Sequence, residues 1–203
     1  MKIICIGRNY LDHVKELNSN LPTEPVFFLK PDTCIINRNQ PFFYPEFSKE
    51  IHYETELVVR INKVGKHIQQ KFANTYYDEL TVGIDFTARD IQRQCQQKGL
   101  PWEISKGFDG AAPIGKFVKK DSFDSIQNIN LKLNINNQTI QQGNTKDMIF
   151  SVDTIISYVS KFITLKMGDI IFTGTPSGVG PVKIGDRLEA FLNDQSLLKV
   201  DIK

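Results

Sequence analysis

Residues 51–59 read IHYETELVV, a run rich in β-branched and aromatic side chains that predicts a β-strand continuing to about residue 61. A strand points alternate side chains to the same face, so the carboxylates of Glu54 and Glu56 are expected to share one space. Like charges this close repel each other unless a positive charge lies between them. The strand therefore either exposes both carboxylates to water at a sheet edge or holds a cation between them.

A third acid, Asp85, comes near the end of another apolar run, TVGIDF at residues 81–86, which also predicts a strand. An acid at the end of a buried strand is costly unless it is paired or coordinated. Three carboxylates with no accompanying His or Cys pattern suit a hard divalent ion, Mg²⁺ or Mn²⁺, rather than zinc. Asp85 thus favours the cation over the solvated edge.

His13 and Glu16 lie three residues apart in a segment, residues 10–17, whose composition predicts a helix. Side chains at this spacing are neighbours on a helix, so Glu16 could orient and polarise His13 as a general base. An exposed His beside an exposed Glu fits the same spacing.

Two glycine-rich segments could contact an anionic substrate. Lys106 is expected in a Gly-flanked loop after Trp102, where it either neutralises a substrate charge or lies exposed. Residues 174–180 (GTPSGVG) predict a tight loop whose backbone amides and Thr175 hydroxyl could hold a carboxylate.

The remaining pattern predicts a single strand-rich α+β domain over residues 1–203. Further strands are expected at residues 3–6, 26–29 and 130–136 and near the C-terminus, with a turn at Asn136 and Asn137 and an extended segment at 41–47. Helices are expected from Thr87 to about Lys98 and after Ser151 to about residue 162.

Composition excludes several classes of partner. A net charge of +2 over 203 residues, without a basic block, argues against a nucleic-acid or anionic-membrane surface, and no apolar run approaches a membrane span. The three cysteines show neither paired metal spacing nor a disulfide framework. With an N-terminal apolar stretch too short for a signal peptide, these features predict a cytoplasmic protein.

Five segments, taken in order, resemble the fumarylacetoacetate hydrolase family in its short, single-domain acylpyruvase and oxaloacetate decarboxylase branch. They span nearly the whole chain and read GRNY at residues 7–10 followed by His13 and Glu16, ETEL at 54–57, DFTARD at 85–90, KGFD at 106–109 and GTPSGVG at 174–180.

The resemblance implies a mixed β-roll flanked by short helices, usually assembled as a homodimer. It implies that Glu54, Glu56 and Asp85 bind Mg²⁺ or Mn²⁺, and that His13 and Glu16 form a dyad that activates water. Lys106 would match the active-site lysine of the family, and Arg89, Gln92 and Thr175 would match positions that contact substrate.

Three hypotheses for function follow. The first is a hydrolase that cleaves a carbon–carbon bond in acylpyruvates such as acetylpyruvate or fumarylpyruvate, with the metal as Lewis acid. The second is decarboxylation or keto–enol tautomerisation of oxaloacetate at the same site, because these reactions share an enolate. The third is a non-catalytic ligand-binding member of the fold, in which replacing His13 would change no turnover.

Overall fold

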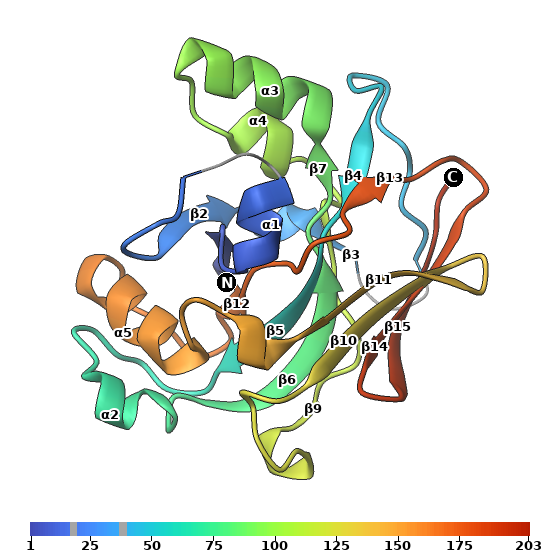
Figure 1. The fold of residues 1–203 in the computed structure, drawn as a ribbon. Helices are drawn as coiled ribbons and strands as arrows, with labels where there is room; N and C mark the ends of the chain where they lie inside the picture. Colours follow the sequence, from blue (N-terminus) through green and yellow to red (C-terminus); the bar gives the residue numbers. More distant parts are fainter. Residues whose placement is uncertain (17–19, 37–39) are drawn as a thin grey trace.

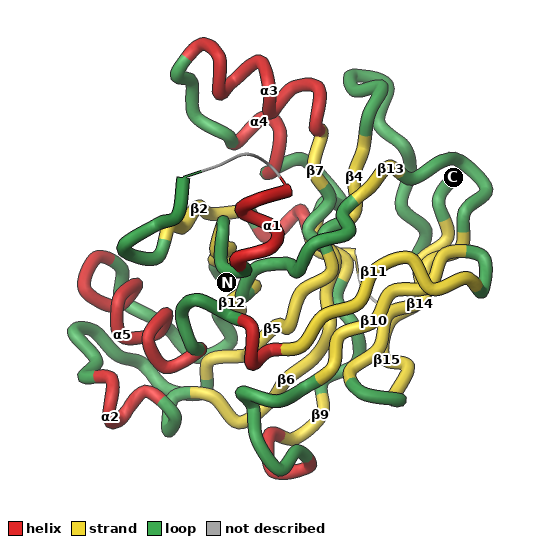
Figure 2. Tube along the Cα trace, viewed as in Figure 1, coloured by secondary structure: helices red, strands yellow, loops and turns green. Residues whose placement is uncertain are grey.

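A computed structural model describes residues 1–16, 20–36 and 40–203 and shows short helices arranged around several β-sheets (Figure 1, Figure 2). The α-helices are α1 (Leu11–Glu16), α2 (Gln70–Ala73), α3 (Arg89–Lys98), α4 (Glu103–Lys106) and α5 (Val152–Phe162). The helix expected over residues 10–17 is thus present as α1, and residue 17 lies outside the described residues.

The largest sheet has six strands and is mixed. In spatial order its strands are β2 (Val26–Lys30), β1 (Ile3–Gly7), β12 (Ile170–Phe172), β5 (Thr55–Ile61), β6 (Tyr77–Ile84) and β9 (Val118–Lys119). β1 runs parallel to β12, with Ile3 opposite Ile170, whereas the other neighbouring pairs are antiparallel. The mixed sheet expected from the family resemblance is confirmed.

A second sheet of four antiparallel strands packs against β5 and β6 of the first. Its strands are β11 (Gln138–Asn144), β10 (Asn130–Ile135), β14 (Arg187–Leu192) and β15 (Gln195–Asp201). Leu131, Leu133 and Ala190 point from it into the core, and Leu57 and Val58 of β5 are fully buried. The core therefore lies between two sheets and buries both faces of β5, which explains why its consecutive residues 57–59 are all apolar.

Two smaller sheets complete the structure. One contains β13 (Gly180–Pro181), β4 (Ile51–Tyr53) and β7 (Thr87–Ala88), and the other contains β3 (Ile35–Ile36) and β8 (Ala112–Pro113). Single helical turns lie at η1 (Asp32–Cys34), η2 (Lys120–Ser122) and η3 (Thr145–Asp147).

The prediction of one continuous strand through Glu54 is wrong. The chain leaves the three-stranded sheet after β4 and enters the six-stranded sheet at β5, with Glu54 at the junction. At this junction the Glu54 carbonyl accepts from the N–H of Asp85 at 2.8 Å, and the Thr55 N–H donates to the Gln141 side chain at 3.1 Å instead of to a strand neighbour. Pairing with two different sheets, rather than local propensity, ends one strand and begins the next.

The helix predicted from Thr87 begins only at Arg89, because Thr87 and Ala88 pair with β4 as β7. Most other local predictions agree with the structure. Ser151 caps α5 by accepting from the N–H of Thr154, and Gly99 ends α3 in the left-handed conformation with φ 63°. Asn136 and Asn137 form the β10–β11 turn with φ 51° and 67°. The strand-rich α+β fold is confirmed. Within the described residues, each helix is too short or too polar to cross a membrane.

Candidate active site and metal centre

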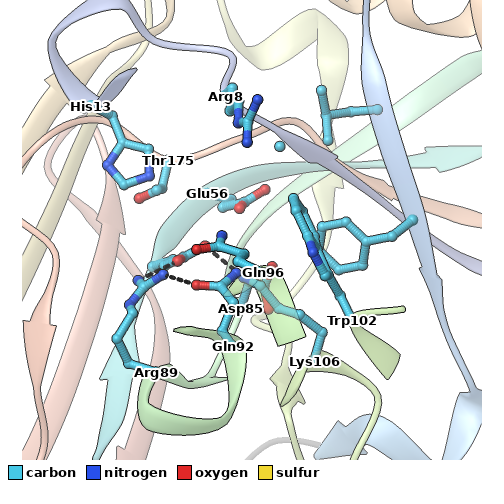
Figure 3. A pocket seen from close by; sticks show the side chains of 14 residues that line it. Arg8, His13, Glu56, Asp85, Arg89, Gln92, Gln96, Trp102, Lys106 and Thr175 are labelled. Atoms are coloured by element: carbon cyan, nitrogen blue, oxygen red, sulfur yellow. Dashed lines mark hydrogen bonds and ion pairs between the residues drawn. The ribbon is translucent and has the colours of Figure 1, made fainter. Parts of the chain in front are cut away.

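A cavity lies where α1, the β4–β5 junction, the end of β6 and helices α3 and α4 meet (Figure 1, Figure 3). Eight of the nine site residues predicted from sequence line it: His13, Glu54, Glu56, Asp85, Arg89, Gln92, Lys106 and Thr175. The ninth, Glu16, lies behind His13 and contacts it. The structure thus gathers the five motifs, which are far apart in the sequence, around one space.

Glu54, Glu56 and Asp85 form a buried acidic cluster. One carboxylate oxygen from each residue lies within 4.8 Å of one from each of the other two, and each residue is at most 6% exposed. Glu54 and Glu56 come together with Asp85 although the strand breaks at Glu54, because Asp85 follows β6, the strand that pairs with β5. Three buried carboxylates in this arrangement match the oxygen ligands that Mg²⁺ and Mn²⁺ prefer.

The pKa of Glu56 reflects the negative charge of this cluster. Burial, together with the negative charges of Asp85 and Glu54, raises the pKa of Glu56 well above its usual range, although Gly174 N–H donates to its Oε2 at 2.6 Å. Among the described residues, the cations of the site pair with Glu54 and Asp85 and none forms an ion pair with Glu56. A divalent ion would supply the missing positive charge, so the residues present fit the metal.

Two cations support the cluster from α3 and α4. Arg89 Nη2 lies 2.6 Å from Glu54 Oε1, and Lys106 Nζ lies 2.8 Å from Glu54 Oε2 and 2.9 Å from Asp85 Oδ2. Burial alone would raise the pKa of Glu54, but Lys106 and Arg89 hold it well below its usual range. Lys106 is the last residue of α4, so its predicted loop position is wrong. The short helix directs its ammonium into the cluster.

Lys106 is a charged group here. Burial opposes its charge, yet Asp85 and Glu54 raise the pKa of Lys106 above its ordinary value. An ammonium that stays protonated suits the stabilisation of negative charge and not the removal of a proton.

His13 and Glu16 form the predicted pair on α1. His13 Nδ1 lies 2.9 Å from Glu16 Oε2, and Glu16 Oε1 accepts from Gly178 N–H at 3.0 Å. His13 is 5% exposed and its ring faces the cavity (Figure 3). The exposed alternative is therefore wrong for His13, whereas Glu16 is exposed as that alternative expected. Glu16 is nevertheless held from two sides in a position to orient the ring.

The loop after β12 contributes Thr175 in a different way from that predicted. Its hydroxyl donates to the Thr55 carbonyl at 2.9 Å and accepts from Gln141 Nε2 at 2.8 Å. The hydroxyl hydrogen is thus used within the protein, and it is not directed at a ligand. Gly174 adopts φ 98°, and a Cβ there would lie 2.7 Å from the Asn9 Cβ, so this loop needs glycine.

Sequence reasoning missed several residues of the site. Lys30, at the end of β2, is fully buried and its Nζ lies 2.6 Å from Asp85 Oδ1. A lone lysine closing an apolar strand before Pro31 was the available signal. Arg8, Gln96, Phe28 and Trp102 also line the cavity. Gln96 follows Gln92 by one helical turn, and Arg8 stands within the GRNY motif itself.

Comparison with known proteins identifies the family to which this fold and this site belong. The family model for the fumarylacetoacetate (FAA) hydrolase C-terminal domain matches residues 2–203. The chain belongs to the fumarylacetoacetate hydrolase family. Its relatives include the mitochondrial oxaloacetate tautomerase FAHD1 of Mus musculus, 43% identical over 201 residues, covering 99% of this chain and 91% of the relative.

Two further members of the fumarylacetoacetate hydrolase family bear on the chemistry. The mitochondrial oxaloacetate decarboxylase of Dictyostelium discoideum is 45% identical over 185 residues, covering 91% of this chain and 85% of the relative. The fumarylpyruvate hydrolase of Pseudomonas aeruginosa, solved in complex with Mn²⁺ and pyruvate, is 34% identical with a TM-score of 0.94, covering 100% of this chain and 89% of that one.

Proposed function

We propose that this chain interconverts the keto and enol forms of oxaloacetate, using Mg²⁺ or Mn²⁺ held by Glu54, Glu56 and Asp85. The observation that carries the proposal is the His13–Glu16 pair facing the buried acidic cluster across one cavity. Relatives at 43–45% identity bear the names oxaloacetate tautomerase and oxaloacetate decarboxylase.

The bound cation would supply Lewis-acid polarisation of the substrate 2-oxo group. The Nδ1 atom of His13 is engaged by Glu16, so Nε2 is the ring nitrogen that would accept a proton from C3 of the substrate. The electrons of the C3–H bond then form the C2–C3 double bond, and the former oxo oxygen receives a proton from the His13 imidazolium, which regenerates the base. Glu16 stabilises the imidazolium, while Arg89 and Lys106 compensate the negative charge of the substrate.

Hydrolysis of acylpyruvates is the second candidate, supported by the likeness to a fumarylpyruvate hydrolase and by the same base. Here His13 would take a proton from water, and hydroxide would attack the distal carbonyl before the carbon–carbon bond breaks. Decarboxylation of oxaloacetate needs no proton removal from C3 and depends on the charge-stabilising groups alone. We also propose that the chain forms a homodimer in solution, as the family resemblance implies, which light scattering would test.

Three assays with Mg²⁺ or Mn²⁺ separate these reactions: ultraviolet absorbance of the oxaloacetate enol, coupled detection of pyruvate, and loss of acetylpyruvate or fumarylpyruvate absorbance.

We expect His13→Gln to slow enol–keto conversion by about 100-fold or more. Glu56→Gln should weaken Mg²⁺ binding by calorimetry on the order of 10-fold or more. The exposed Asp194→Asn is the matched control and should change neither. A wild-type protein that accelerates none of the three reactions above the metal-only rate would refute an enzymatic role.

A further inference from the structure

Arg8 is a cation of the cavity that the acidic cluster does not use. It follows β1 in a bend and lies above Glu56 in Figure 3, with Arg89 and Lys106 on the other side. Arg89 and Lys106 are both paired with the cluster, at 2.6–2.9 Å. Within the described part of the chain, Arg8 has no carboxylate within 4.0 Å of its guanidinium. The positive charge of Arg8 is thus available to bind an anionic ligand.

The backbone at Arg8 is strained in a way that fixes the side chain. Its φ is 60°, in the left-handed region that costs a non-glycine residue about 1–2 kcal/mol. The neighbouring Asn9 is fully buried, and its amide donates to the carbonyls of Thr173 at 2.7 Å and Phe150 at 3.0 Å while accepting from Phe150 N–H at 2.7 Å. These bonds hold the bend, so Arg8 enters the cavity from a rigid base.

The surroundings of Arg8 favour a strong ion pair with a ligand. Trp102 lies against the preceding Gly7 and packs edge-to-face on Phe28, with ring centroids 5.9 Å apart. These rings line the same cavity as Arg8, and Arg8 itself is only partly exposed. A charge-assisted, bidentate bond from arginine to a carboxylate is worth more in such a place than in water.

The charge balance points to a dianion. The described side chains that line the cavity or contact its titratable lining residues include four carboxylates, Glu16, Glu54, Glu56 and Asp85, and four permanent cations, Arg8, Lys30, Arg89 and Lys106. These balance one another, and a divalent ion would add two positive charges. A ligand with two carboxylates neutralises that excess, whereas a monocarboxylate leaves half of it.

We propose that Arg8 binds the substrate carboxylate remote from the 2-oxo group, and so selects short dicarboxylates over 2-oxo acids that end in a methyl group. This inference rests on the proposed function for the nature of the substrate. Arg8 is thus a specificity-determining residue on the cavity wall opposite Arg89 and Lys106.

Two non-reacting ligands that differ only at the remote end test the proposal by calorimetry in Mg²⁺. Malate ends in a carboxylate, and 2-hydroxybutyrate has a methyl group in its place. We expect the wild type to bind malate about 10-fold or more tighter, from one charge-assisted pair. Arg8→Gln should bring the two affinities within about 3-fold by weakening malate alone. The exposed Lys98→Gln removes the same charge from α3 and should keep the preference.

Arg8→Gly separates a binding role from a structural one. Glycine adopts φ 60° without strain, so this variant should melt no lower than the wild type and still lose the malate preference. If Arg8→Gln fails to fold, the malate preference of Arg8→Gly tests the binding role by itself. In kinetics, both variants should lose about 10-fold or more in kcat/KM for oxaloacetate and less than about 3-fold for acetylpyruvate.

A wild type without a malate preference, or variants that weaken both ligands equally, would overturn the role of Arg8. If the wild type turns over no substrate yet prefers malate in an Arg8-dependent way, the proposed function fails and the carboxylate site stands. If oxaloacetate and acetylpyruvate are both turned over with equal sensitivity to Arg8→Gln, the proposed function stands and the role of Arg8 fails.

Discussion

Lys30 shows how much of this site depends on single buried charges. Its ammonium is fully buried, lies 2.6 Å from Asp85 Oδ1, and donates to the carbonyls of Ala111 at 2.8 Å and Phe86 at 3.2 Å. It thereby fixes both the charge and the position of Asp85 from behind the cavity. A buried ion pair contributes little net stability by itself, but removing one partner leaves an uncompensated charge in the core.

Replacing this cation alone should therefore be severe. We expect Lys30→Met to lower the free energy of unfolding by about 3–5 kcal/mol in urea with a chelator present. Adding Asp85→Asn in the same chain should recover part of the loss, because no charge is then left unpaired. The exposed Lys98→Met should stay within about 0.5 kcal/mol of the wild type. Strictly additive effects of Lys30→Met and Asp85→Asn would mean that the pair is not coupled.

At the scale of elements, α3 carries Arg89 and Gln92 into the cavity, and Asp90 holds its first turn. Asp90 accepts from the Ser48 hydroxyl at 2.7 Å and from the backbone N–H groups of Ile91 at 2.9 Å and Lys49 at 3.0 Å. Burial would raise the pKa of Asp90, but these bonds hold it below its usual value. An acid at this end of a helix also interacts favourably with the helix dipole.

The lowered pKa fixes the direction of a pH effect. A carboxyl group whose folded pKa is lowered contributes stability above its unfolded pKa, about 3.9, and loses it as the pH falls through the folded value. Asp90→Asn should therefore cost about 1 kcal/mol at pH 7, measured by urea unfolding, and the difference from wild type should shrink as the pH falls below 4. The exposed Asp124→Asn should show no such convergence. A constant difference from pH 7 to pH 3 would argue against the charge of Asp90.

At the scale of the whole molecule, Gln141 joins the four-stranded sheet to the site. It is buried on β11, and its side chain accepts from Thr55 N–H at 3.1 Å and donates to the Thr175 hydroxyl and the Pro176 carbonyl, both at 2.8 Å. It thus replaces a missing strand partner at the β4–β5 junction, between the two glutamates of the cluster. The second sheet positions the metal ligands as well as covering the core.

Gln141→Leu should separate these roles from simple packing. Leucine fills similar space but leaves the Thr55 N–H and the Pro176 carbonyl without partners, at about 1–3 kcal/mol for each buried group. We expect Gln141→Leu to unfold at a lower denaturant concentration than the wild type. We also expect it to bind Mg²⁺ several-fold more weakly, as do variants of other groups that orient metal ligands. Gln142 is exposed on the same strand, so Gln142→Leu is the matched control. Unchanged Mg²⁺ affinity in Gln141→Leu would restrict its role to stability.

The sequence alone determined the strand-rich fold, most helix and strand positions, the acidic trio and the His13–Glu16 pair. These features follow from local periodicity, caps and motif spacing, which depend on residues close together in the chain. Tertiary structure alone decided the break at Glu54, the burial of Lys30 against Asp85 and the use of the Thr175 hydroxyl inside the protein. It also left the guanidinium of Arg8 without a carboxylate partner among the described residues. Each of these depends on hydrogen-bond partners and charges from segments far apart in sequence, whose balance exists only once the sheets have packed.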